Sequence, residues 1–274
     1  MNVLLTGAYG RVGTAIIDHL AGDDEYDFTY LDKTDHPDHE TVVADIADYE
    51  ATKPAFEGAD AVVHLAGYPY TDGDWRDILE SNIIGLYNAL EAAAEAEVET
   101  FVFASSNHAV GMYEIENAPD IYFPEFDLTV DHTDPVRPDS YYGTSKSFGE
   151  DLGRYYVENE DYPKSFYGLR ICSVRHEEYD HPYGDAERGV DEDRWERDSD
   201  EYAQAVARMK AMWQSRRDLA HMVDRCLQTD GVAFDIFYGV STNDRRWFDI
   251  DHACEVIDYE PQDNGDKWDG PPAR

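Results

Sequence analysis

The stretch Thr6-Gly7-Ala8-Tyr9-Gly10-Arg11-Val12-Gly13 follows a short apolar run, Val3–Leu5, and precedes a helical pattern that extends to Leu20. Glycines spaced GxxGxxG between a strand and a helix allow a tight turn and the close approach of a pyrophosphate, and Gly13 lets the helix pack closely on the strand. The helix N-terminus adds unpaired N–H groups and a positive dipole end. This stretch therefore predicts a dinucleotide-binding turn.

Short apolar runs alternate with helical patterns on both sides of this turn, through about the first 175 residues. The expected strands are 3–5, 28–31, 41–44, 61–65, 100–104 and 165–172, and the expected helices are 10–20, 49–56, 75–96 and 145–157. Such alternation predicts an α/β fold of the Rossmann type, a doubly wound parallel sheet covered on both faces. Its ligand should lie at the carboxyl ends of the strands.

The alternation stops after Cys172. Residues 176–201 are rich in Asp, Glu and Arg with little apolar periodicity, so we expect a loop, a lid or a surface insertion there. A helix over 203–227, a strand over 234–240 that could join the sheet and a helix over 249–257 follow. We therefore expect an NAD-binding domain over 1–172, a small, partly interleaved substrate-binding region over 173–262 and a flexible tail over 263–274.

The charge balance limits the possible partners. The chain has 274 residues, 22 of them basic and 60 acidic, for a net charge of −38, yet 42% are hydrophobic and 13% aromatic. A disordered acidic chain would lack that apolar content. Nucleic acid and anionic membranes are disfavoured, because phosphate binding needs clustered basic residues. Only six of the 22 basic residues are lysines, which favours a salt-adapted protein over an ordinary acidic cytoplasmic one.

The cellular location of the protein and the absence of a metal site are predicted from the cysteine spacing, the first residues and the lengths of the apolar runs. Cys172, Cys226 and Cys254 lie far apart without metal-ligand spacing, so we expect a reducing cytoplasm and no metal site. The chain begins with a strand rather than a signal peptide, and no apolar run approaches the ~20 residues of a membrane helix. We therefore expect a cytoplasmic protein.

Asp32 ends the second expected strand, nineteen residues after Gly13. A carboxylate there accepts hydrogen bonds from the adenosine ribose and repels a 2′-phosphate, so it selects NAD over NADP. The alternative is a surface aspartate in an Asp-rich chain. Around it, Asp45 and Ile46 should flank the adenine, and the other wall of the cleft should come from Leu65, Ala66 and Gly67.

The segment Tyr142-Gly143-Thr144-Ser145-Lys146 places a tyrosine and a lysine one turn apart at the start of a helix. A phenol has a pKa near ~10, and lowering it by ~3 units takes ~4 kcal/mol, which a nearby ammonium and a positive nicotinamide ring can supply. The run Ser105-Ser106-Asn107-His108 ends the fifth expected strand and brings a hydroxyl for the reacting oxygen. Together they predict a Ser–Tyr–Lys catalytic set.

These motifs, in this order, resemble the extended short-chain dehydrogenase/reductase superfamily over most of residues 1–262. The segments 81–88, 103–108 and 169–171 are similar to those of the uronate dehydrogenases and of the NAD-dependent glucose-6-phosphate dehydrogenases of halophilic archaea. Both groups oxidise C1 of a cyclic sugar to a lactone. The resemblance implies that Ser106 is the catalytic serine, Tyr142 the base and Lys146 its partner. The expected cofactor-binding residues are Gly7, Tyr9, Gly10, Arg11, Val12, Gly13, Asp32, Asp45, Ile46, Leu65, Ala66, Gly67, Asn82, Ser105, Tyr142, Lys146 and Ile171.

The resemblance also implies where the sugar binds. The expected substrate-binding residues are Tyr70, Ser106, Asn107, His108, Ser173 and Arg208. Arg208 and Trp213, spaced R-x4-W, resemble the element that binds the anionic end of the sugar in these enzymes. The alternative is that Arg208 is a solvated arginine on a helix. Arg216 and Arg217 are other candidates for binding the anionic end. The loop 67–75 has a length similar to the glucose-6-phosphate group, whereas the acidic stretch 177–201 exceeds both groups.

The sequence therefore predicts an NAD-dependent dehydrogenase that oxidises C1 of an anionic aldose, glucose 6-phosphate or a hexuronate. One alternative is a nucleotide-sugar epimerase or dehydratase that retains its NAD, although only 102 residues follow Cys172 to hold a nucleotide. Another is a non-catalytic NAD-sensing regulator, although such proteins tend to lose the tyrosine or the lysine. We also expect a homo-oligomer, a dimer through the helices over 83–96 and 145–157.

Overall fold

The computed structural model describes residues 1–273 and contains a seven-stranded sheet in which every neighbouring pair of strands is parallel. The strand order is β3-β2-β1-β4-β5-β6-β7, so the order reverses between β1 and β4, where α/β sheets of this kind bind their ligands. The strands are β1 (Asn2–Thr6), β2 (Asp27–Asp32), β3 (Thr41–Val43), β4 (Ala61–His64), β5 (Thr100–Ser106), β6 (Ser165–Ile171) and β7 (Phe234–Gly239). The α/β Rossmann expectation is confirmed, and the 234–240 segment joins the sheet as its edge strand.

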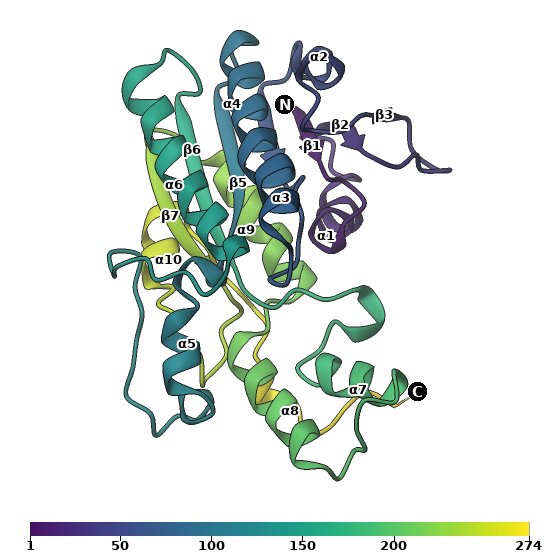
Figure 1. The fold of residues 1–274 in the computed structure, drawn as a ribbon, viewed down its shortest axis with the longest axis vertical. Coiled ribbons are helices and arrows are strands. Elements are labelled where there is room, and N and C mark those ends of the chain that lie inside the picture. Colours follow the sequence, from purple (N-terminus) through teal and green to yellow (C-terminus); the bar gives the residue numbers. More distant parts are fainter. Residues whose placement is uncertain (274) are drawn as a thin grey trace.

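Helices cover both faces of the sheet (Figure 1). Successive residues of a strand point to opposite faces, so Leu4 packs with the helices over residues 85–95 and 141–159, while Leu5 packs with the helices over 11–20, 216–228 and 251–257. The helices are α1 (Arg11–Leu20), α2 (Tyr49–Thr52), α3 (Trp75–Ile78), α4 (Gly85–Glu95), α5 (Met112–Asn117), α6 (Tyr141–Asn159), α7 (Gly184–Asp191), α8 (Asp200–Met212), α9 (Arg216–Gln228) and α10 (Asp251–Ile257). The expected helix over 75–96 includes a π-helical turn, Leu79–Ile84, between α3 and α4.

A smaller group of helices, α5, α7 and α8, lies beyond the carboxyl ends of the strands (Figure 1). Its core joins α8 to the loops around Val130 and Trp247, and the buried side chains Met212 and Phe248 belong to it. None of the helices described over residues 1–273 is long and apolar enough to cross a membrane.

The structure corrects three local expectations. The 176–201 segment is not a plain loop, because it forms α7, and Trp195 packs on this helix and donates to the Ala186 carbonyl oxygen at 2.9 Å. The helix expected over 203–227 is broken into α8 and α9, because Trp213 leaves the helix to pair with Ser173. The tail expected to be flexible packs as far as Trp268, whose carbonyl oxygen accepts a hydrogen bond from Lys210 Nζ at 2.8 Å; residue 274 lies outside the described residues.

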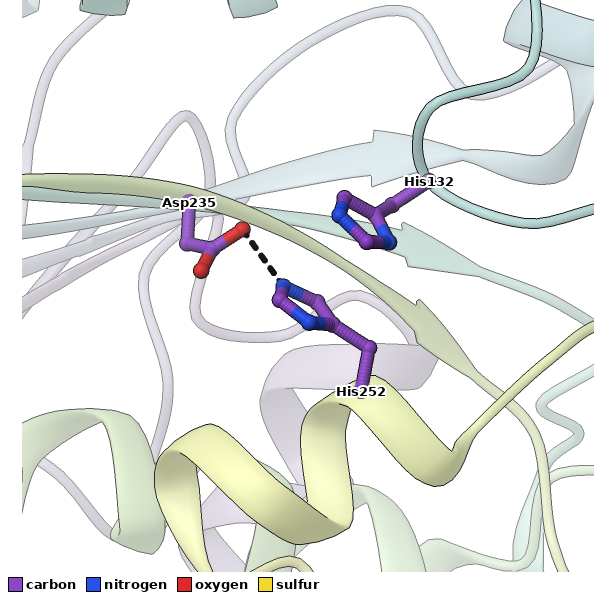
Figure 2. Close-up of side chains that lie close together, drawn as sticks. All are labelled: His132, Asp235 and His252. Carbon is purple, nitrogen blue, oxygen red and sulfur yellow. Dashed lines mark hydrogen bonds and ion pairs between the residues drawn. The ribbon is translucent and has the colours of Figure 1, made fainter.

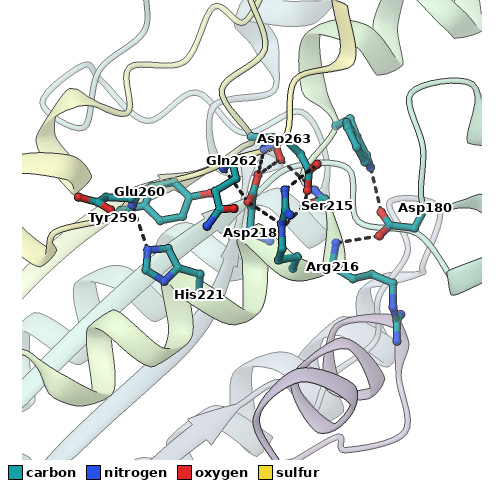
Figure 3. Close-up of polar contacts among 12 residues, drawn as sticks. Asp180, Ser215, Arg216, Asp218, His221, Tyr259, Glu260, Gln262 and Asp263 are labelled. Carbon is teal, nitrogen blue, oxygen red and sulfur yellow. Dashed lines mark hydrogen bonds and ion pairs between the residues drawn. The ribbon is translucent and has the colours of Figure 1, made fainter. Parts of the chain in front are cut away.

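The N-terminus of α9 is tied to the rest of the molecule by a polar network (Figure 3). The buried carboxylate of Asp218 accepts hydrogen bonds from Ser241 Oγ at 2.6 Å and from the backbone N–H groups of Gln262 and Asp263 at 2.9 and 3.0 Å. His221 accepts one from the Glu260 N–H at 3.0 Å. These bonds hold the C-terminal segment onto α9.

Arg216 extends this network to the cleft end of the sheet. Its buried guanidinium donates to the carbonyl oxygens of Arg11 and Arg175, at 3.3 and 3.4 Å, and forms an ion pair with Asp18. Arg217 pairs with Asp263 at 2.8 Å. Both arginines therefore hold elements of the fold together, and neither is among the residues that line the cleft at the carboxyl ends of the strands.

Candidate active site

A cleft of about 1030 Å³ opens at the carboxyl ends of the strands and extends from the β1–α1 turn to the end of β6. This volume is at the upper end of ordinary ligand sites, which leaves room for a cofactor and a small substrate together. Nearly all of the residues predicted for the site line this cleft: Gly7, Tyr9, Gly10, Arg11, Val12, Gly13, Asp32, Ile46, Leu65, Ala66, Gly67, Tyr70, Ser105, Ser106, Asn107, His108, Tyr142, Lys146, Ile171, Ser173 and Arg208.

Two predicted cofactor residues, Asp45 and Asn82, do not line the cleft. Asp45 instead forms an ion pair with Lys33 Nζ at 3.0 Å. Asn82 lies in the π-helical turn, accepts a hydrogen bond from the Tyr68 N–H at 2.6 Å and donates one to Ser145 Oγ at 3.0 Å. Asn82 therefore ties the loop after β4 to α6, which positions the wall of the cleft.

The β1–α1 turn fits a dinucleotide. Gly7 has a φ of +68°, and a Cβ there would lie 2.7 Å from the Ala66 backbone nitrogen, so the turn requires glycine. The Tyr9 N–H donates to Asp32 Oδ2 at 3.1 Å, which fixes the carboxylate at the end of β2 beside the turn. A glycine cradle, a helix N-terminus and an acceptor for ribose hydroxyls therefore lie together.

The predicted catalytic groups meet where β5 ends and α6 begins. Ser140 caps α6 by accepting the Gly143 N–H at 3.0 Å, which places Tyr142 in the first turn. Lys146 is buried, with Nζ 5.3 Å from the centre of the Tyr142 ring. Ser106, at the end of β5, lines the same cleft and lies near enough to Tyr142 to lower the pKa of its hydroxyl. The three side chains therefore share one end of the cleft.

Burial sets the protonation of these groups. It raises the pKa of Tyr142 above the usual value of a phenol, while the Ser106 hydrogen bond and the charge of Arg11 lower that pKa in part. Burial also lowers the pKa of Lys146 to about 8. The side chains alone therefore do not produce the lowered Tyr142 pKa that we expected from the lysine and the nicotinamide ring together. Further positive charge near the phenol is needed to lower this pKa.

The structure distinguishes the two adjacent serines. Ser105 Oγ donates to Glu150 Oε1 at 2.6 Å, inside a buried network in which Arg170 makes two hydrogen bonds to Glu150, at 2.9 and 2.8 Å. Ser105 is therefore occupied by a structural bond, and Ser106 is the serine that meets Tyr142. Next to them, His108 Nδ1 lies 2.6 Å from Asp139 Oδ2, which fixes its ring 5.9 Å from that of Tyr142.

Arg208 lines the cleft, but its charge is matched. Glu114 accepts its Nε at 2.5 Å and its second guanidinium nitrogen at 3.1 Å, and Glu114 also accepts the Tyr122 hydroxyl at 2.8 Å. Sequence reasoning missed three further arginines of the cleft wall, Arg175, Arg188 and Arg194. Their one signal is that they are basic residues in or next to an acidic run.

A second group of titratable side chains comes from β7, from α10 and from the loop before α6 (Figure 2). His252 Nε2 lies 2.9 Å from Asp235 Oδ1, and the rings of His132 and His252 are stacked 3.6 Å apart at 9°. Potential ligand atoms of the three lie within 4.8 Å of one another. Two parallel rings cannot both direct a lone pair at one ion about 2.0–2.1 Å away, so this arrangement is a histidine–histidine stack next to a histidine–aspartate pair.

Comparison with known proteins identifies the family. The model of the NAD dependent epimerase/dehydratase family matches residues 3–226. The chain belongs to this NAD dependent epimerase/dehydratase family. The description of this family names the cofactor NAD, and the cleft of this chain contains the glycine turn that fits such a dinucleotide.

Within the NAD dependent epimerase/dehydratase family, this chain is similar to several dehydrogenases that are named for a sugar or a sugar acid. The NAD-dependent glucose-6-phosphate dehydrogenase of Haloferax volcanii is 40% identical over 96% of this chain and 93% of its own length. The L-arabinose 1-dehydrogenase (NAD(P)(+)) of the same organism is 36% identical, over 96% of each chain. Among solved structures, the glucuronic acid dehydrogenase of Chromohalobacter salexigens has a TM-score of 0.74 and 31% identity, over 97% of this chain and 86% of that one.

Proposed function

We propose that this family member is a sugar 1-dehydrogenase that oxidises C1 of a cyclic aldose with an anionic end, such as glucose 6-phosphate or a hexuronate, to the lactone. At the coarser level, the protein is an NAD-dependent oxidoreductase that acts on a CH–OH group of a sugar. The proposal depends on one observation, the meeting of Ser106, Tyr142 and Lys146 beside the glycine turn. Similarity to the glucose-6-phosphate, L-arabinose and glucuronic acid dehydrogenases supports it.

Each of these side chains has a distinct role in the proposed reaction. Bound NAD+ supplies the acceptor for the hydride that leaves C1. Tyr142 takes the proton of the O1 hydroxyl, and Ser106 hydrogen-bonds the same oxygen, so the C1–O1 group loses one proton and one hydride. The Lys146 ammonium stabilises the phenolate of Tyr142, because Lys146 is buried with its Nζ 5.3 Å from the centre of the Tyr142 ring.

Other residues of the cleft orient the sugar. Asn107, His108 and Ser173 present polar groups to the same cleft as Tyr142, and Tyr70 lies on the loop after β4. His108 is held by Asp139, so its position does not depend on the substrate. Such fixed contacts align C1 for the reaction and supply much of the rate enhancement by orientation.

A substrate panel tests the proposal directly. Formation of NADH is followed with glucose 6-phosphate, glucuronate, L-arabinose and glucose, at low and at molar KCl. We expect turnover with an anionic sugar to exceed turnover with glucose. The Tyr142→Phe variant should lose about 10²- to 10⁴-fold in kcat while NADH still binds, because it removes only the base. Tyr141→Phe is the matched control, because Tyr141 is the exposed neighbour of Tyr142 and this variant also loses one phenolic hydroxyl.

Two results would contradict the proposal. Absence of turnover with every sugar of the panel at both salt concentrations would exclude a sugar 1-dehydrogenase of this specificity. NAD that copurifies with the protein, without net NADH formation, would instead support the alternative of an epimerase or dehydratase that retains its cofactor.

A further inference from the structure

Three guanidinium groups, those of Arg11, Arg175 and Arg188, gather on one side of the cleft. Burial, and then the charges of Arg175 and Arg188, lower the pKa of Arg11, so the three charges act on one another. Asp185 is the carboxylate among them: it binds Arg175 through two hydrogen bonds, at 2.6 and 2.5 Å, and it lies 3.3 Å from Arg188. Three cations and one carboxylate leave about two positive charges at this place.

Two of the three arginines have guanidinium N–H donors without a hydrogen-bond partner among the described residues. Arg188 Nε is buried and has no hydrogen-bond partner. Among residues 1–273, no hydrogen bond or ion pair to the Arg11 guanidinium is found. Buried donors are nearly always paired in folded proteins, so the unpaired Arg188 Nε points to an acceptor that comes from outside the chain, and the Arg11 guanidinium on the same cleft is available to the same acceptor. The other cleft arginines differ, because Arg208 is bound by Glu114 and Arg194 by Glu192, at 2.9 Å.

The backbone holds these groups in a fixed frame. Arg11 is the first residue of α1, and Arg188 lies in α7, the helix formed by the acidic segment after β6. Arg216 donates to the carbonyl oxygens of both Arg11 and Arg175, so the start of α1 and the loop after β6 are tied together. The Arg175–Asp185 pair in turn fixes the start of α7 beside that loop. The separation of Arg11 and Arg188 is therefore set by the fold.

We propose that Arg11 and Arg188 form an anion clamp that binds a phosphate group within the cleft. The inference rests on the proposed function, because it names the anionic group that the dehydrogenase site accepts. A phosphate carries up to two negative charges, which match the two unbalanced positive charges, and its several oxygens can accept from two guanidinium forks at once. A carboxylate has only two oxygens to share between the two guanidinium groups. Two phosphates share this chemistry, the phosphoryl group of a sugar phosphate and the pyrophosphate of the dinucleotide.

The test replaces Arg188 by Gln, which removes the charge and keeps a hydrogen-bonding side chain. Arg188→Lys keeps the charge, and Arg76→Gln is the control, because it removes the same charge from an exposed site. Arg11→Gln tests the clamp from a second element. If the clamp binds a sugar phosphate, Arg188→Gln and Arg11→Gln should raise the KM for glucose 6-phosphate about tenfold or more. In Arg188→Gln the KM for L-arabinose and the Kd of NADH should then stay within twofold, and Arg188→Lys should recover part of the loss.

If the clamp binds the pyrophosphate instead, the same variants raise the Kd of NADH, measured by fluorescence without any sugar, about tenfold. All measurements use one KCl concentration, because salt screens these contacts. Either result supports the clamp, and an unchanged Kd of NADH together with an unchanged KM for glucose 6-phosphate in both Gln variants would overturn it. The fluorescence titration needs no turnover, so weaker NADH binding in a protein that oxidises no sugar would sustain the clamp and reject the dehydrogenase. Far-ultraviolet circular dichroism of each variant separates these outcomes from unfolding of α7.

Discussion

His64 lies at the end of β4, below the catalytic groups, and its ring is 1% exposed. Its Nδ1 lies 2.9 Å from Thr6 Oγ1, on the neighbouring strand. Burial, and then the charge of Lys146, lower the pKa of His64 to about 3. The imidazole is therefore held neutral in the folded protein, where a charged ring would face a buried ammonium.

This residue should make the protein sensitive to acid. The unfolded chain protonates His64 near pH 6.5, and the folded chain does so only near pH 3, so the unfolded state binds more protons between these values. The free energy of unfolding should therefore fall as the pH falls below about 6.5, by up to about 1.4 kcal/mol per pH unit from this group. Denaturant titrations at pH 7, 6, 5 and 4 should show a shallower fall in His64→Gln than in the unchanged protein. The exposed His19→Gln is the control, and equal slopes in all three proteins would contradict the role given to His64.

For individual residues, the sequence predicted which chemical groups the site contains better than which groups bind one another. Tyr142 and Lys146 were recognisable because helix geometry fixes the relation of residues four apart. Arg208 was expected to be available to the substrate, yet it is bound by Glu114, 94 residues earlier in the chain. Such a partner is set by how distant segments pack, which no local spacing reveals.

Helix α6 carries the tyrosine and the lysine, and it can do so because glycines let it lie close to the sheet. A Cβ on Gly149 would meet Phe103 Cζ at 2.4 Å and Leu86 Cδ2 at 2.8 Å. Phe103 is buried in β5, and its ring also lies 5.0 Å from Lys146 Nζ. The distance between α6 and β5 therefore sets the position of Lys146.

Gly149→Ala should consequently reduce both stability and activity. The extra methyl group should cost about 1–3 kcal/mol in overpacking, which exceeds the gain of about 1 kcal/mol in helix propensity. Displacement of α6 should also lower kcat several-fold, because it moves Tyr142 and Lys146 away from Ser106. Thermal unfolding and steady-state kinetics measure the two effects. In Gly22→Ala, where nothing lies within 4 Å of the new methyl group, both should be unchanged or slightly improved, and equal behaviour of the two variants would argue against the packing argument.

Elements with a regular apolar period were predictable, and elements held by tertiary contacts were not. Strands β1, β4, β5 and β6 are runs of mostly buried residues, so their type and their order along the chain could be inferred. Helix α7 has few apolar residues of its own, and it depends on Trp195 against Gly189 and on the Arg175–Asp185 ion pair. The acidic segment 176–201, which we expected to be a loop, a lid or a surface insertion, therefore forms a helix that brings Arg188 to the wall of the cleft.

For the whole molecule, the net charge of −38 and the arrangement of exposed apolar side chains bear on assembly. Large exposed apolar side chains gather on α3, α4, α6 and the turn between α3 and α4: Trp75, Ile84, Tyr87, Tyr141, Phe148 and Tyr155. Exposed apolar groups that gather on adjacent elements favour a contact between proteins. We propose that this face forms the homodimer that the sequence analysis expected through 83–96 and 145–157.

Salt should control this dimer. Two copies that each carry −38 repel one another, and the Debye length shortens from about 30 Å at 0.01 M salt to about 3 Å at 1 M. Light scattering after size-exclusion chromatography should therefore show dimers at molar KCl and monomers at low KCl. Tyr87→Glu should prevent the dimer at molar KCl, because it places a charge in the apolar face. Ile115→Glu is the matched control, because it adds the same charge at an exposed apolar position on α5, outside that face, and should leave the dimer intact. A Tyr87→Glu protein that still dimerises would move the contact to another surface, and a monomer at every KCl concentration would exclude the dimer.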